Sequence, residues 1–116
     1  MIKTTAALPL YNASPIAWLC LESLAAQQVD KSHEWELVIA EEETPRPFTK
    51  EAVMKYLPAL GAAGCRRLRY IPLHTRVPLA DKWRLLAEEA SPSAQAFVMM
   101  EADNYTHPFR LQAAYD

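Results

Sequence analysis

The stretch that decides the fold is WELVIA, residues 35–40, which three glutamates follow at 41–43. A strand with one face in water alternates apolar and polar side chains, whereas this run is apolar almost throughout. Nearly continuous apolar strands are typical of parallel sheets, because helices cover both faces of such sheets. We therefore expect a buried strand that ends at the glutamates, in a sheet with helices on both sides.

Strand and helix patterns alternate around this run. Further strands are expected over residues 4–11, 67–73 and 96–100, and helices over 15–28, 50–60, 79–90 and 109–115. The order β-α-β-α-β-α-β-α favours right-handed crossovers and a mostly parallel sheet. We predict a single three-layer α/β/α domain over residues 1–116.

Three residues mark the expected helix boundaries. Ser14 is expected to cap the first helix, since serine hydroxyls accept bonds from free helix amides. Thr49 is expected to cap the second helix in the same way. Pro58 weakens the last turn of that second helix, because proline lacks an amide hydrogen.

Composition and charge narrow the classes of function. A net charge of −2 gives no electrostatic reason to expect a nucleic acid partner. No apolar run approaches the ~20 residues that span a bilayer, so no membrane span is expected. Cys20 and Cys65 are too few for a disulfide framework, and we expect buried free thiols and a cytoplasmic protein. With no Cys-x-x-Cys, a structural zinc site is not expected.

Polar residues follow each expected strand: Tyr11 and Asn12, the glutamates at 41–43, residues 74–76 and residues 101–105. Open α/β sheets bind ligands beyond the carboxyl ends of their strands. After the fourth strand, Glu101 and Asp103 stand one residue apart, a spacing that puts strand side chains on one face. Two carboxylates there could hold a divalent cation, and the cation a phosphate. The alternative is that both acids only end a buried strand at the surface.

Taken in order, these clusters resemble the family 2 glycosyltransferases and their GT-A fold. The resemblance rests on the following segments: LPLYN at 8–12, like Pro-x-Tyr-Asn; LCLESLAAQ at 19–27, like Leu-x-Ser-Leu-x-x-Gln; VIAEE at 38–42; ADKW at 80–83, like the Ala-Arg/Lys-Asn helix start; and VMMEADN at 98–104, like Asp-x-Asp. Each motif alone is weak evidence, and the resemblance rests on the order and spacing that the motifs share with the family. They cover only the nucleotide-binding half of such an enzyme.

This resemblance implies a truncated GT-A, nucleotide-diphospho-sugar transferase-like domain whose sheet has the strand order 3-2-1-4. Its donor would be a nucleotide-sugar such as a UDP-sugar, held through Mn²⁺ or Mg²⁺ and transferred to an acceptor hydroxyl. Asp103 is the implied metal ligand, with Glu101 on the metal, its bound water or the ribose. The implied nucleotide contacts are Tyr11 at the base and Glu41 near the base and ribose, with Glu42 as a weaker candidate there. Asn12 would shape the turn after Tyr11. Lys82 would contact the diphosphate, and Arg76 and Arg84 are the alternatives to it.

The segment after the acidic pair offers no obvious catalytic base, so the catalytic residues are unknown. The fourth strand is expected to form an exposed edge, which invites pairing with a second copy or another chain. Two alternatives remain open. The chain could be a repurposed domain that binds a nucleotide or a protein without catalysis, or a non-transferase α/β domain whose acids are only surface caps.

Overall fold

The computed structural model describes residues 1–116, and its elements alternate along the chain as expected. The strands are β1 (Ile2–Leu10), β2 (Glu34–Glu42), β3 (Cys65–Leu73) and β4 (Ala96–Met99). The helices are α1 (Ala17–Ala25), α2 (Lys50–Met54), α3 (Leu57–Ala62), α4 (Leu79–Glu89) and α5 (Arg110–Tyr115). All strand pairs are parallel, and the order β3-β2-β1-β4 confirms the predicted topology.

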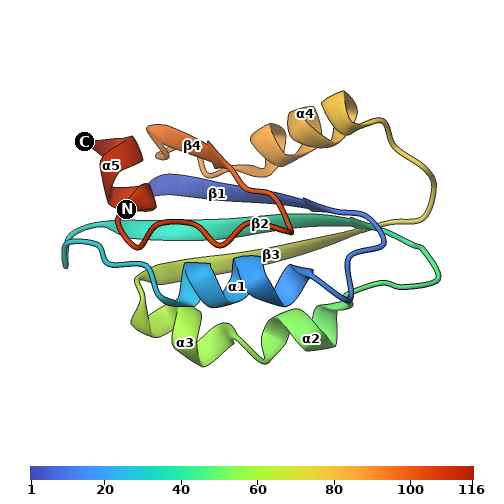
Figure 1. Cartoon of the computed structure of the whole chain (residues 1–116). Helices are drawn as coiled ribbons and strands as arrows, with labels where there is room; N and C mark the ends of the chain where they lie inside the picture. Colours follow the sequence, from blue (N-terminus) through green and yellow to red (C-terminus); the bar gives the residue numbers. More distant parts are fainter.

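Helices cover both faces of the sheet, unequally. In Figure 1, α1, α2 and α3 lie on one side of the strands and α4 lies on the other. The first side holds a core cluster of 19 buried residues, which includes Leu37 and Ile39 of β2. The α4 side holds a smaller cluster built around Val38, Ala40 and Leu86. Buried side chains of β2 thus alternate between two cores, as its apolar run predicts.

The first two predicted helices differ most from expectation, and the first, predicted over 15–28, is the shorter α1 at Ala17–Ala25. The helix predicted over 50–60 is two helices, α2 and α3, and Pro58 lies in the first turn of α3. Proline has no amide hydrogen and its ring clashes with the preceding turn, so one continuous helix is broken there. Ser14 does not cap α1, because residues 14–16 form a turn and the amide of Ser14 donates to the carbonyl of Arg46. The predicted Thr49 cap is confirmed, since its hydroxyl accepts from the amide of Ala52.

Both cysteines are free and buried, as predicted. Burial raises the pKa of Cys20 to about 12 and that of Cys65 to about 11, so both remain thiols at neutral pH. No helix has the length and apolar character needed to cross a membrane.

The two edges of the sheet are of different character. The β3 edge carries Arg66, Arg69 and Pro72, all exposed, and charges and proline discourage edge pairing. The β4 edge has no charge within the strand, and Phe97 and Met99 are exposed on it. The predicted exposed edge at the fourth strand is therefore confirmed, and association through it remains a prediction.

A fully buried carboxylate, Glu36, joins four elements near the amino-terminal ends of the strands. It accepts hydrogen bonds from Thr5 Oγ1 at 2.6 Å, Ser91 N and Oγ at 2.7 Å, and Arg67 Nη1 at 2.8 Å. Burial opposes ionisation of Glu36, but the bonds from Ser91, Thr5 and Arg67 outweigh it and lower the pKa below 4.5. Glu36 therefore remains ionised at neutral pH and fixes β1, β3 and the end of α4 to β2.

We predict that Glu36→Gln lowers the free energy of unfolding by about 2–4 kcal/mol, because a glutamine amide nitrogen would face donors and leave Arg67 unpaired. The carboxylate contributes its stability above its unfolded-state pKa and loses it as pH falls through the lower folded-state pKa. Urea unfolding at pH 7 measures the loss, and the difference between the two proteins should shrink below pH 4.

The control is Glu88→Gln, which changes an exposed carboxylate on α4 that has no ion pair or hydrogen bond. Equal stability of Glu36→Gln and the wild-type chain at pH 7 would contradict this account of Glu36.

Candidate functional site

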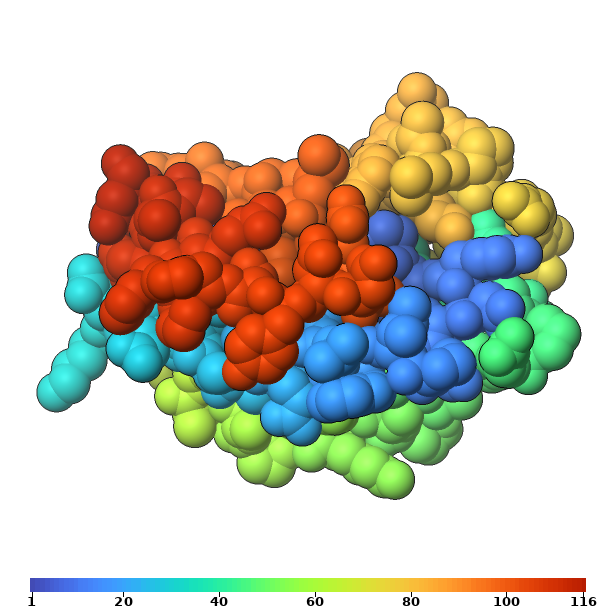
Figure 2. Space-filling view, in the orientation of Figure 1, coloured from blue at the N-terminus to red at the C-terminus, as the bar shows by residue number.

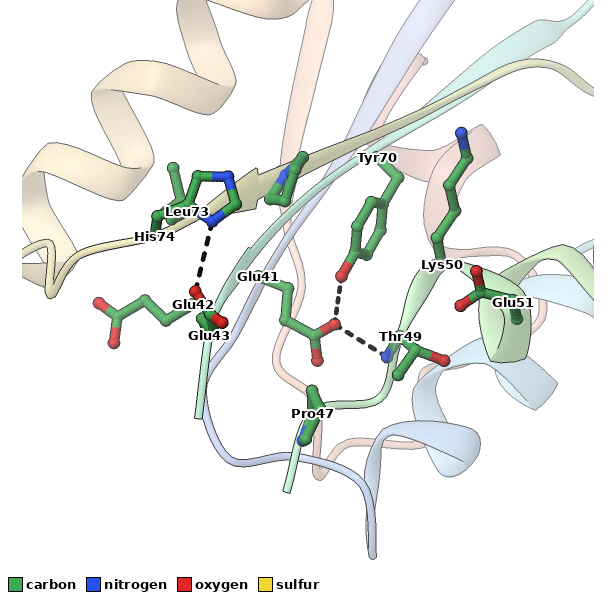
Figure 3. A pocket seen from close by; sticks show the side chains of 11 residues that line it. Glu41, Glu42, Glu43, Pro47, Thr49, Lys50, Glu51, Tyr70, Leu73 and His74 are labelled. Carbon is green, nitrogen blue, oxygen red and sulfur yellow. Dashed lines mark hydrogen bonds and ion pairs between the residues drawn. The ribbon is translucent and has the colours of Figure 1, made fainter. Parts of the chain in front are cut away.

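The polar residues predicted from the sequence gather at the carboxyl edge of the sheet, on two different sides of it. The register pairs Leu10 of β1 with Glu41 of β2, so the next residues, Tyr11 and Glu42, also lie level with each other. Adjacent strand residues point to opposite faces. Figure 3 shows the side chains of Glu41 and Glu42 directed to opposite sides of β2.

On the α4 side, Tyr11 is surrounded by two cations. Arg76 lies over the Tyr11 ring, with Cζ 5.1 Å from the centroid, and its Nη1 donates to Tyr11 Oη at 3.3 Å. Lys82 Nζ lies 5.4 Å from the same centroid. Tyr11 is 51% exposed, so part of this residue, with two cations beside its ring, is open to solvent.

Glu42 connects this cluster to the loop before α4. Its Oε1 accepts from the amide of Val77 at 2.7 Å and pairs with Lys82 Nζ at 3.1 Å. Both Glu42 and Lys82 are almost fully buried. Burial opposes the charge of Glu42, but the Val77 amide, Lys82 and nearby Arg76 lower its pKa below the usual value. Glu42 is therefore an anion that positions residues 76–82, and its second oxygen is free of protein hydrogen bonds.

Glu41 has a different set of partners, on the α2 side. Its carboxylate accepts from the amides of Phe48 and Thr49 and from the Tyr70 hydroxyl, as Figure 3 shows for Thr49 and Tyr70. Burial raises the pKa of Tyr70, and its bond to Glu41 raises it further, so the hydroxyl remains a donor. Glu41, Thr49 and Tyr70 line a cavity of about 270 Å³ beside α2, which Glu42 also borders. Glu41 thus holds the loop between β2 and α2.

Strained backbone and unpaired polar atoms occur at this same edge. Asn12 and Thr49 have positive φ angles, 51° and 73°, which asparagine adopts readily and a β-branched threonine rarely does. Asn12 Oδ1 and Thr44 Oγ1 are buried without a hydrogen-bond partner, as is His33 Nδ1 at the amino-terminal end of β2. Unusual backbone at Thr49 and two of the three unpaired atoms thus occur at the carboxyl edge, where such features are often functional.

Glu101 and Asp103 lie beyond β4 in a turn, so strand alternation does not apply to them. The amide of Met100 donates to Ala7 at 2.8 Å, and the turn closes with a bond from Asn104 N to Glu101 O at 3.1 Å. Asn104 Nδ2 also donates to Glu101 Oε2 at 3.2 Å. Asp103 is exposed and makes no hydrogen bond or ion pair.

The acidic turn lies on the α1 side of the sheet. Burial is the main cause of the raised pKa of Cys20 in α1, and the nearby Asp103 carboxylate raises it further. Figure 2 shows the chain after β4, in orange to red, against the blue surface of α1. The turn is therefore on the side of the sheet away from Lys82 and Glu42.

The acidic turn fits a hard divalent cation in its chemistry. Carboxylate oxygens are the ligands that Mg²⁺ and Mn²⁺ prefer, and Asp103 has both oxygens free. No group of three or more His, Cys, Asp or Glu side chains is arranged around a common point. A metal here would therefore take its remaining ligands from phosphate and water.

Tyr11 and Lys82, both predicted from motif positions in the sequence, lie together in the structure. Arg76, predicted as an alternative to Lys82, also lies beside Tyr11. The sequence favours Glu41 as the main nucleotide carboxylate of β2, although the structure places Glu42 beside Tyr11. Val38, Ala40 and Glu42 are alternate residues of one strand, so strand alternation places Glu42 on the α4 face with the other two. Arg84 is exposed on α4 and is not among the contacts of Tyr11.

No family model matches this sequence, and no curated protein sequence is significantly similar to it. Three solved structures of S. aureus TarS, a glycosyltransferase, are similar in fold. For TarS the TM-score is 0.78 at 23% identity, over 97% of this chain and 19% of that chain. For TarS 1–349 the TM-score is 0.79 at 23% identity, over 97% and 31%.

The third structure is TarS 1–349 in complex with UDP-GlcNAc, with a TM-score of 0.77 at 23% identity, over 97% of this chain and 30% of that chain. The chain thus spans less than a third of the length of the solved chains it matches. Together with the parallel sheet of order β3-β2-β1-β4, these matches show that the chain has a glycosyltransferase-like fold.

Proposed function

We propose that this chain binds the nucleotide part of a nucleotide-sugar at the carboxyl edge of its sheet, for sugar transfer to an acceptor hydroxyl. The observation that carries the proposal is the open Tyr11 ring with Arg76, Lys82 and Glu42 around it. The similar fold of TarS 1–349, solved with UDP-GlcNAc, supports UDP as the first ligand to test.

Each residue of the cluster has a proposed role. The exposed Tyr11 ring stacks on the base, and Asn12, in its left-handed conformation, turns the chain so that the ring faces outward. The free oxygen of Glu42 accepts from the ribose or the base. Lys82 and Arg76 face the diphosphate. For Glu41 we propose a supporting role, because its bonds already hold the loop before α2.

A divalent metal at Asp103, with Glu101 on the metal, its water or the ribose, completes the proposed donor site. When bound, such a metal stabilises the negative charge of the departing diphosphate. Asp103 is the stronger candidate, since one oxygen of Glu101 already accepts from Asn104. The two free, buried thiols support the cytoplasm as the proposed compartment.

Binding and transfer are separable properties. Transfer requires a base positioned against the acceptor hydroxyl, and the proposed donor site assigns no residue to that task. A chain that binds UDP but neither transfers nor hydrolyses the sugar of a UDP-sugar would be a nucleotide-binding domain without catalysis. Assays of binding and of sugar transfer on the same protein separate these two functions.

We predict that Tyr11→Ala weakens UDP binding by about ten- to a hundredfold, because base stacking on an aromatic ring contributes roughly 1–3 kcal/mol. Isothermal titration calorimetry with UDP measures the change. The control is Phe109→Ala, since Phe109 is 52% exposed, as Tyr11 is, but precedes α5. If the chain bound no UDP at millimolar concentration, or if Tyr11→Ala bound it normally, the proposed site would be wrong.

We predict that Mn²⁺ strengthens UDP binding to the wild-type chain and that Asp103→Ala removes this increase. Glu101→Gln should remove only part of it, because one Glu101 oxygen is already engaged. Titrations with and without Mn²⁺ measure the effect of the metal on each protein. Asp30→Ala is the control, since it removes an exposed carboxylate far along the chain. An unchanged response to Mn²⁺ in Asp103→Ala would exclude Asp103 as the metal ligand.

A further inference from the structure

We infer that Arg76 and Lys82 form a diphosphate-binding pair that holds a nucleoside diphosphate without a divalent cation. This inference rests on the proposed function, because it concerns the diphosphate of the same nucleotide. It adds a source of affinity that is separate from the acidic turn at Glu101 and Asp103.

The first support is that one aromatic ring positions both cations. Arg76 Cζ and Lys82 Nζ lie 5.1 and 5.4 Å from the centroid of Tyr11. A base that stacks on Tyr11 thus brings its attached phosphates close to both positive charges. Guanidinium and ammonium groups are the side chains that bind phosphate in proteins.

The second support is the local charge balance. The three arginines of β3 are each paired with a glutamate, Arg67 with Glu36 for example, whereas Arg76 has no ion pair. Around Tyr11 two cations face one carboxylate, that of Glu42. Asp81, exposed in the first turn of α4, is a further acid next to Lys82 in the sequence, so the charge of this cluster that has no partner is that of Arg76. An exposed cation without an ion pair attracts an anion.

The third support is the position of Lys82. It lies in the first two turns of α4, where the helix dipole disfavours a cation, and it is only 5% exposed. Burying a lysine is unfavourable, and Glu42 alone compensates it. The start of α4 has no side-chain cap, and Pro78 precedes it. An anion bound here would therefore find partners in Lys82, Arg76 and the free first amides of α4.

With Glu42 beside them, the two cations together contribute about one net positive charge. The pair can therefore offset part of the charge of a diphosphate by itself, while a metal at Asp103 would add to the affinity. The acidic turn lies on the α1 side of the sheet, and the pair lies on the α4 side. The two contributions are thus separable by mutation.

The test is calorimetry with UDP and with uridine, in EDTA and in Mn²⁺. We expect the wild-type chain to bind UDP in EDTA within about tenfold of its affinity in Mn²⁺, and to bind uridine much more weakly. Arg76→Gln and Lys82→Met should each weaken UDP binding in EDTA by about tenfold or more, with uridine binding unchanged. The affinity for UDP in EDTA should also fall as salt rises.

Arg84→Gln is the matched control, because Arg84 is an exposed cation two residues after Lys82. Lys82→Arg keeps the charge and should retain UDP binding in EDTA, and Arg76 is exposed, so its variant should fold normally. UDP binding that requires Mn²⁺, or normal binding in EDTA by Arg76→Gln, would overturn the inference and leave the proposed function intact. Failure of both UDP and uridine to bind in either condition would overturn both.

Discussion

Burial of β2 on both faces is the constraint on which the rest of the structure depends. Because helices pack on each side of this strand, its apolar side chains divide between two cores, and the sheet must be parallel with crossovers on both faces. The same alternation continues past the last apolar residue. It sends Glu41 toward α2 and Glu42 toward α4, so the core packing of the strand decides which carboxylate faces Tyr11.

Three carboxylates on β2 are buried, and each is stabilised differently. Glu36 has hydroxyls, an amide and an arginine around it, and Glu41 has two amides and a tyrosine hydroxyl. Both have several protein donors, as buried anions require. Glu42 has one amide and one lysine, both on the same oxygen. It is the only one of the three that leaves an oxygen free beside an exposed aromatic ring. This difference separates two carboxylates that protein donors occupy on both oxygens from one that keeps an oxygen without a protein donor.

Hydrophobic periodicity predicted the alternation of strands and helices and the region of the site, because periodicity and the ends of strands are local properties. The strand order, Tyr11 and Lys82 came instead from the resemblance to a family, through the order and position of its motifs. The division between Glu41 and Glu42 was missed, although alternation from Val38 contained it. Other features depend on contacts far along the chain and leave no local pattern. The bonds of Ser91 to Glu36, 55 residues away, and the position of Arg76 over Tyr11 are of this kind.

The short β4 determines how the two halves of the site meet. It pairs only with residues 4–7 of β1, so the chain leaves the sheet before β1 ends, and the acidic turn begins alongside the last residues of β1. Tyr11 follows those residues directly, with its cations on the α4 side, whereas Asp103 lies toward α1. A nucleotide stacked on Tyr11 would therefore have to cross the end of β1 for its phosphates to meet both Lys82 and Asp103. The residue at that crossing is Asn12, whose left-handed backbone turns the chain out of β1 and whose buried Oδ1 accepts no hydrogen bond from the protein.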